Sequence, residues 1–180
     1  MEETEVPLED AQEHIHESAH HSGIKWISWA ALASGIVAVF AAISALLSGS
    51  QANEAMILQL KASDSWNYYQ AKGVKAAVLS SKMDLLKEMG RPAVSEDSEK
   101  LKAYKEDQDK ISEGAKELEK ESEHHLATHE TMAKSVTFFQ VAIALGAIAV
   151  LSRRQKFWFV SLGFAGIGLA ILAKGLLMLV

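Results

Sequence analysis

Histidine is the residue type most able to do chemistry in this chain, and it occurs in two pairs with helical spacing. His16 and His20 are four residues apart, and so are His125 and His129. This spacing places two imidazoles on one face of a helix, where Zn, Ni, Co or Cu binds. Glu54 is expected close to His129 if the chain folds back on itself. The candidate divalent transition-metal sites are therefore Glu54, His125 and His129, and His16 and His20.

The alternative is that these histidines are polar residues lying where the chain meets lipid headgroups. Pairs four apart arise on helices by chance, and the sequence has no HExxH motif. It has no cysteine, which excludes thiol nucleophiles and thiolate metal sites. No Ser–His–Asp arrangement stands out, so we expect no enzymatic activity and no cofactor other than the metal. The charge pattern also lacks the basic face that nucleic acid requires.

Three apolar runs, at residues 26–49, 135–151 and 157–180, decide the class of protein. A helix needs about 20 apolar residues to cross a hydrocarbon layer of about 30 Å. The first two runs contain no Asp, Glu, Lys or Arg, and the third contains only Lys174. We predict an all-α membrane protein with three transmembrane helices and the lipid bilayer as a partner.

The segment between the first two runs, residues 50–134, is dense in charge and has one helix-breaking site, Gly90-Arg91-Pro92. We predict a stalk in which arms 51–89 and 95–135 fold about Pro92 into an antiparallel helical hairpin. Apolar residues at alternating spacings of three and four form a coiled-coil seam. On the first arm these include Ala55, Leu58, Ala62, Trp66, Tyr69, Gly73 and Ala76; on the second they include Leu101, Tyr104, Gln108, Ile111, Ala115, Leu118 and Ser122.

The aromatic cluster at Trp66, Tyr68 and Tyr69 has two interpretations. The three side chains could receive a protein partner or a cation. Alternatively, Trp66 and Tyr69 are packing residues of the seam, which leaves Tyr68 exposed.

A second apolar stripe lies on another face of the first arm, and a lone hairpin cannot bury it. It comprises Ile57, Leu60, Ala71, Val74, Val78 and Leu85. A helix that is apolar on two faces is usually buried on both. In the first apolar run, Ala30, Ser34 and Ala38 repeat every four residues, a spacing that lets membrane helices approach closely. We therefore expect a homo-oligomer that associates through the first arm and the first span.

Arg153, Arg154 and Lys156 lie in the shortest loop, and short basic loops stay in the cytoplasm. The N-terminus is then cytoplasmic, and the stalk is periplasmic or extracellular. The expected organisation is an acidic, histidine-containing leader at 1–25, spans at 26–49, 135–151 and 157–180, a helical hairpin at 50–134 and a basic loop at 152–156.

Several segments resemble a known family. They are KWIS at 25–28, QANEA at 51–55, KASDSWNYYQAKG at 61–73, FFQ at 138–140 and SRR at 152–154. Together they are similar to the bacterial membrane family known as domain of unknown function 4337. The resemblance implies a bacterial envelope protein of this layout, in the inner membrane. It implies no activity, substrate or catalytic residue.

We predict that the chain is a non-enzymatic, self-associating membrane scaffold or spacer with a projecting coiled-coil stalk. The alternative is an oligomeric channel or a transport component that responds to metal or protons. The first apolar run offers only serines as polar side chains and no ring of charge, which argues against a wide aqueous pore.

Overall fold

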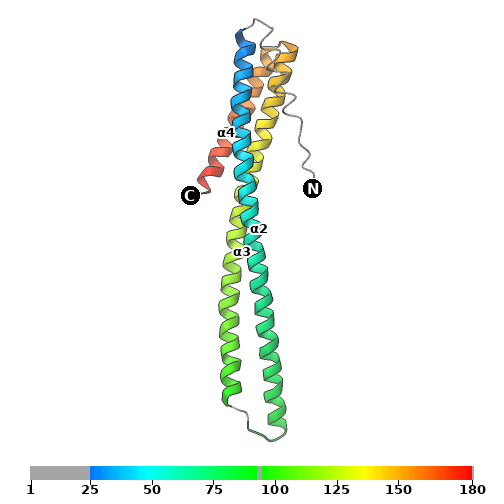
Figure 1. Cartoon of the computed structure of the whole chain (residues 1–180), viewed down its shortest axis with the longest axis vertical. Helices are drawn as coiled ribbons and strands as arrows, with labels where there is room; N and C mark the ends of the chain where they lie inside the picture. The colour runs from blue at the N-terminus through cyan, green and yellow to red at the C-terminus, as the bar shows by residue number, and fades with distance from the viewer. Residues whose placement is uncertain (1–24, 93–94, 180) are drawn as a thin grey trace. The chain divides into compact units, whose positions relative to one another are not determined.

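The structure is a computed structural model that describes residues 25–92 and 95–179. These residues form three helices and no strand: α2 spans Lys25–Glu88, α3 spans Ser95–Ser152 and α4 spans Gln155–Leu177 (Figure 1). The all-helical class is confirmed. Each of the three helices contains a stretch long and apolar enough to cross a membrane. The predicted leader, with His16 and His20, lies outside the described residues except for Lys25.

The chain divides into two compact units, which we describe separately. The apolar unit comprises the described residues up to 52 and from 126 onward, and the charged unit comprises residues 53–125. The predicted boundaries near residues 50 and 135 do not interrupt a helix, because α2 and α3 continue through them. Gly49 is the weakest helix former at the first boundary, and a single glycine costs a helix only about 1 kcal/mol.

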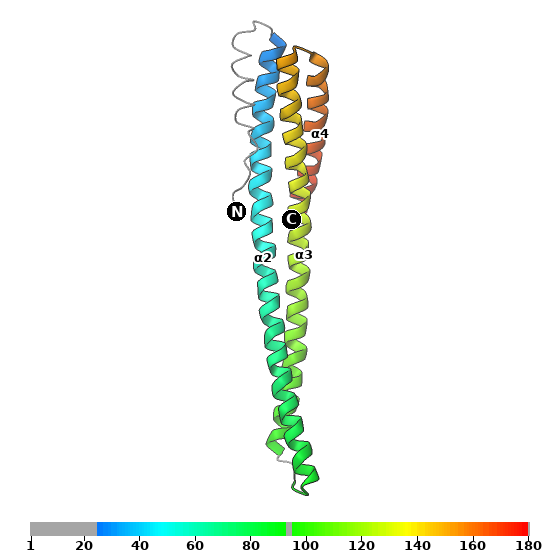
Figure 2. The ribbon, with the colours of Figure 1, turned by 90° about the vertical axis from the view of Figure 1, so that its right-hand side faces the viewer.

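The apolar unit is a bundle of α4 with parts of α2 and α3 (Figure 2). One buried cluster consists of Ile27, Ala30, Ala31, Ala147 and Val150, with Trp26 and Trp158 packed against it. A second cluster joins Ala41, Phe139 and Leu172.

Glycine permits the close approach of α4 to α3 in this bundle. A Cβ atom added at Gly168 would lie 2.8 Å from the ring of Phe139, which is fully buried. The hydroxyl of Ser161 donates to the carbonyl of Ala142 over 2.6 Å, a second tie between these helices.

The turn between α3 and α4 is tighter than the predicted loop at 152–156. Helix α4 begins at Gln155, so only Arg153 and Arg154 separate the two helices. Arg153 has a φ of 52°, and its N–H donates to the carbonyl of Val150. The left-handed conformation ends α3 and satisfies carbonyls of its last turn, as glycine does in most such caps.

In the charged unit, contacts pair the two helices in a regular order. Trp66, Lys72 and Lys82 of α2 contact Glu119, Asp107 and Asp97 of α3, so the partner's number falls as the α2 number rises. The seam positions predicted for both arms are buried or half-buried. The carbonyl of Ala55 accepts a hydrogen bond from the buried hydroxyl of Ser122, which adds a polar contact near the far end of this unit.

Within the predicted break Gly90-Arg91-Pro92, helix α2 is capped at Gly90. Gly90 has a φ of 70°, which glycine adopts without steric cost. The N–H of Gly90 donates to Lys87 O and that of Arg91 to Leu86 O, so both bonds close the end of α2. Pro92 follows this cap, where it prevents α2 from continuing.

Candidate self-association surface

Trp66 and Tyr69 lie in the contact between α2 and α3. Both are half-buried, and their rings pack edge to face with centroids 5.5 Å apart. The indole Nε1 of Trp66 donates to Oε1 of Glu119 over 2.8 Å. Tyr68 is 52 % exposed on α2. The geometry therefore matches the packing interpretation of this aromatic cluster.

Glu119 was missed by the sequence analysis, because it belongs to an acidic run that is typical of a solvent-facing helix. A buried or half-buried indole N–H normally finds an acceptor. That requirement was the signal that could have identified a carboxylate opposite Trp66.

Lys72 is a second polar contact between α2 and α3 that sequence reasoning did not identify. Its Nζ donates to Oδ2 of Asp107 over 2.6 Å and lies 5.4 Å and 5.3 Å from the ring centroids of Tyr68 and Tyr104. The hydrogen bond to Asp107 raises the pKa of Lys72 above its ordinary value, and burial acts in the opposite direction. The same bond lowers the pKa of Asp107. The pair is thus held in its charged form across the seam.

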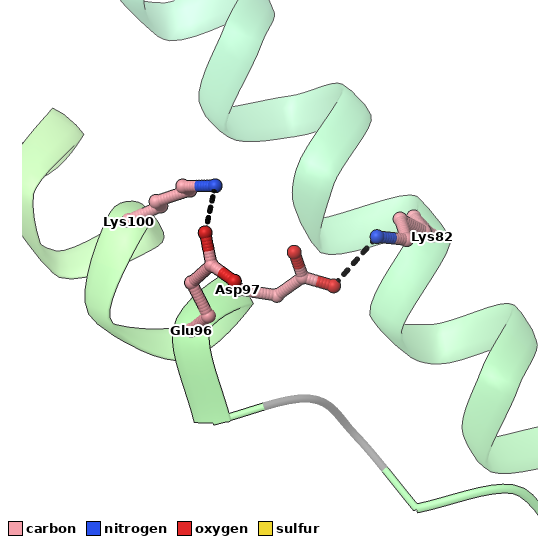
Figure 3. A network of polar contacts seen from close by, with 4 residues as sticks. All are labelled: Lys82, Glu96, Asp97 and Lys100. Atoms are coloured by element: carbon pink, nitrogen blue, oxygen red, sulfur yellow. Dashed lines mark hydrogen bonds and ion pairs between the residues drawn. The ribbon is translucent and has the colours of Figure 1, made fainter.

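Near Gly90, a small polar network holds the start of α3 to α2 (Figure 3). Nζ of Lys82 donates to Oδ2 of Asp97 over 2.7 Å, and Asp97 is itself buried. Lys100 donates to Glu96 along α3, and this bond raises the pKa of Lys100. Asp97 and Glu96 also lie in the first turn of α3, where carboxylates favour the positive end of the helix dipole.

The structure gives the predicted metal residues other surroundings. In the apolar unit, Nδ1 of His129 lies 2.9 Å from both the carbonyl and the hydroxyl oxygen of Ser48. The ring of His125 packs edge to face with that of His124, and Glu54 is exposed. Within residues 25–92 and 95–179, no three His, Asp or Glu side chains are grouped so that they could hold a metal ion. Metal binding by Glu54, His125 and His129 therefore gains no geometric support.

The second stripe on α2 is left uncovered in the charged unit. Val74, Val78 and Leu85 are 64 %, 65 % and 59 % exposed, and Ile57 and Leu60 are exposed too. An open groove runs beside this stripe toward the end of α2, lined by Ala77, Val78, Ser81, Lys82, Leu85, Leu86 and Met89. A contiguous apolar patch on an exposed surface is typical of interaction sites.

Part of the small-residue repeat of the first apolar run packs against α3 of the same chain, and not against another copy as predicted. Ala30 is fully buried and packs with Ala147 and Val150 of α3, and Ser34 is buried as well. A Cβ atom added at Gly146 would lie 2.8 Å from the hydroxyl of Ser34. Ala38 is half-buried. Because α3 of the same chain covers Ala30 and Ser34, these two residues do not face another copy, and the prediction is corrected for them. For Ala38, association with another copy stays a prediction.

The comparisons with known proteins identify one family. A family model, Domain of unknown function (DUF4337), matches residues 26–178, which include all three helices except for Lys25. No curated protein and no solved structure matches the chain. Since the match spans most of the sequence, the chain belongs to the DUF4337 family.

Proposed function

We propose that this protein is a non-enzymatic membrane scaffold of the bacterial envelope that self-associates and projects an antiparallel helical hairpin from the membrane. The hairpin acts as a spacer or docking post. In this proposal the three apolar helical stretches are transmembrane spans, and the charged unit is the stalk.

The composition of the helices supports the membrane assignment. The apolar windows of α2, α3 and α4 have mean hydropathies of 2.3, 2.0 and 1.9, and less than half of each window is buried within the chain. Their exposed side chains include Leu32, Ile36 and Leu46 of α2 and Leu151 of α3. In a bilayer these side chains face lipid, whereas in water they would form a large apolar surface.

The proposed orientation rests on the turn between α3 and α4. Arg153, Arg154 and Lys156 are all exposed there, and short basic turns stay in the cytoplasm. The charged unit is then periplasmic or extracellular. A cysteine at Ser98 should react with an impermeant maleimide in intact cells, and one at Ser152 should not; the reverse pattern would invert the topology.

The antiparallel hairpin is supported by the order of contacts across the seam. Ion pairs join Lys72 to Asp107 and Lys82 to Asp97, and Gly90 lies midway between the paired residues. These contacts hold the two arms to each other but leave the opposite face of α2 open.

The single observation that carries the self-association proposal is the exposed apolar stripe of α2 in the charged unit. Val74, Val78 and Leu85 lie among charged residues, at more than half of their full exposure. Burying one such side chain gains about 1.5–3 kcal/mol. A second copy offers the same surface, so the stripe can be covered on both copies at once.

The test is the native mass of the full chain in mild detergent at micromolar concentration. Wild type should be oligomeric, and Val78→Asp should be monomeric with its helical circular dichroism retained. Ala103→Asp is the matched control, because it adds the same charge at an exposed position on α3. A monomeric wild type, or equal dissociation of both variants, would reject the proposal.

A further inference from the structure

Helix α2 has two opposite faces that both repeat every seven residues. From Ile27 to Met83, every seventh residue is buried or half-buried. Within each unit, this face packs against the other helices of that unit. From Trp29 to Leu85, every seventh residue is exposed, and the same is true from Leu32 to Glu88. We call the positions of these last two series the outer stripe.

The outer stripe has the residue pattern of a coiled-coil seam. Its two series are separated by three and four residues in alternation, which is the a/d pattern of heptads. Eight heptads separate Trp29 from Leu85, and most positions between them are aliphatic. The pattern passes from the apolar unit into the charged unit without a change of phase. A surface selected only to face lipid would have no reason to continue in phase into the charged unit.

Three polar interruptions lie in this seam between Trp29 and Leu85, and the third is Ser81 alone. The first is Ser50 with Asn53, and the second is Asp64 with Asn67. Both asparagines belong to the series that begins at Leu32. A polar residue at one seam position fixes the register of a coiled coil at a cost in stability, because any shift places it against an apolar residue. A shift by one heptad here would set Asn53 against Leu60.

Small residues flank the outer stripe in the apolar unit. Gly35, Ala42 and Gly49 are seven residues apart. Each lies one position before a residue of the Trp29 series, namely Ile36, Ile43 and Ser50. A Cβ atom added at Gly35 or Gly49 would meet nothing within 4 Å. This open space would let a further helix approach α2 closely, which membrane helices require in order to pack.

We infer that the outer stripe is the seam of a parallel, in-register association of α2 with α2 of a second copy of this chain. The inference rests on the proposed function and specifies its interface. Copies inserted into one membrane in the same sense are related by an axis along the membrane normal. They therefore lie parallel and at the same height. Each layer then meets its own copy, asparagine against asparagine and valine against valine, which is the one register that keeps all polar layers together.

The natural absence of cysteine makes this seam testable by disulfide formation in the full chain. Single cysteines replace Ser50 and Ser81, which lie on the outer stripe, and Ser80, which is the adjacent serine and lies off it. Membranes containing each variant are oxidised and run on non-reducing gels. We expect Ser50→Cys and Ser81→Cys to form dimers at least several-fold more completely than Ser80→Cys. Two differently tagged variants, Ser50→Cys and Ser81→Cys, should form no mixed disulfide when they are co-expressed.

The outcomes separate the seam from self-association itself. If wild type is oligomeric but Ser80→Cys cross-links as well as Ser81→Cys, the seam is wrong and the scaffold proposal survives. A mixed disulfide between positions 50 and 81 would show a staggered or antiparallel arrangement and overturn the inference. A native mass of one copy, alone or with a different protein, would overturn both proposals.

Discussion

The two units use the same helix, α2, but differ in the side chains that α2 places against the other helices. In the apolar unit its buried residues are mostly small, including Ala30, Ala31, Ser34 and Ser44, and large side chains such as Trp29 and Leu46 are exposed. In the charged unit the face toward α3 includes Trp66 and Tyr69, and small residues such as Ala62 alternate with them.

The contrast shows how the surroundings determine what a seam must contain. In water, burying a large apolar side chain is itself a driving force, so an aromatic residue stabilises the helix pair. In a bilayer, lipid is as apolar as the side chains, and close packing of small residues holds helices together instead. The constant period of seven and the change in these side chains are thus consistent with one helix passing between two solvents.

Removing the aromatic side chain should have the largest effect in the charged unit. Trp66→Ala should lower stability by about 3 kcal/mol, at the low end for large aromatic truncations because Trp66 is half-buried. The change also leaves Glu119 without its indole donor. Chemical unfolding of the full chain in detergent, followed by circular dichroism, measures the change. Tyr68→Ala removes an exposed ring of the same cluster and should cost less than about 1 kcal/mol. Equal losses in the two variants would contradict the packing role of Trp66.

In the apolar unit, the corresponding test adds a side chain at a glycine where α4 approaches α3 closely. Gly168→Val should cost roughly 1–3 kcal/mol, because overpacking forces the ring of Phe139 to move. Gly166→Val is the matched control, since a Cβ at Gly166 meets nothing within 4 Å. The temperature at which half of the helical signal is lost in detergent should fall only for Gly168→Val. A similar fall in both variants would attribute the effect to helix propensity and not to close packing.

The smallest effect should come from the Lys72–Asp107 pair and should depend on pH. The pKa of Asp107 is lowered from 3.8, so its contribution is present above that pH and is lost as the pH falls through the lower, folded-state value. Asp107→Asn should therefore flatten the acid side of the stability profile, and Lys72→Met should flatten it equally. The double variant should add nothing further. If the double variant changed the pH dependence of stability by the sum of the two single changes, the two groups would titrate independently.

Much of the fold follows from residue pattern. The positions of the three apolar runs, the break after Glu88 and the buried seam positions from Ala55 to Leu86 could all be predicted, because helical periodicity is a strong signal over long segments. The residue that caps α2 could not, since Gly90 and Pro92 both break helices. Only the backbone conformation shows that the glycine forms the cap.

The contacts of polar residues were harder to predict than those of apolar residues. Sequence pattern places Glu119, Asp107 and Asp97 on a charged helix, but it does not show that the first accepts from an indole or that the other two pair with lysines of α2. Long flexible side chains reach across several positions, so their partners depend on the register between the helices. The use of Ala30 and Ser34 was missed for a related reason: small residues indicate close packing but not which helix packs there.

The position of the tie between Lys82 and Asp97 has a consequence for how the chain folds. These residues are 15 apart in sequence, whereas the pairs at Lys72–Asp107, Trp66–Glu119 and Ser48–His129 are 35, 53 and 81 apart. Closing the longest of these loops first would cost about 1.5 kcal/mol more in chain entropy than closing the shortest. Contacts next to the Gly90 turn should therefore form first, and each one shortens the loop that the next must close. Pairing of the helices therefore proceeds outward from this turn, and contacts such as Ser48–His129 form last.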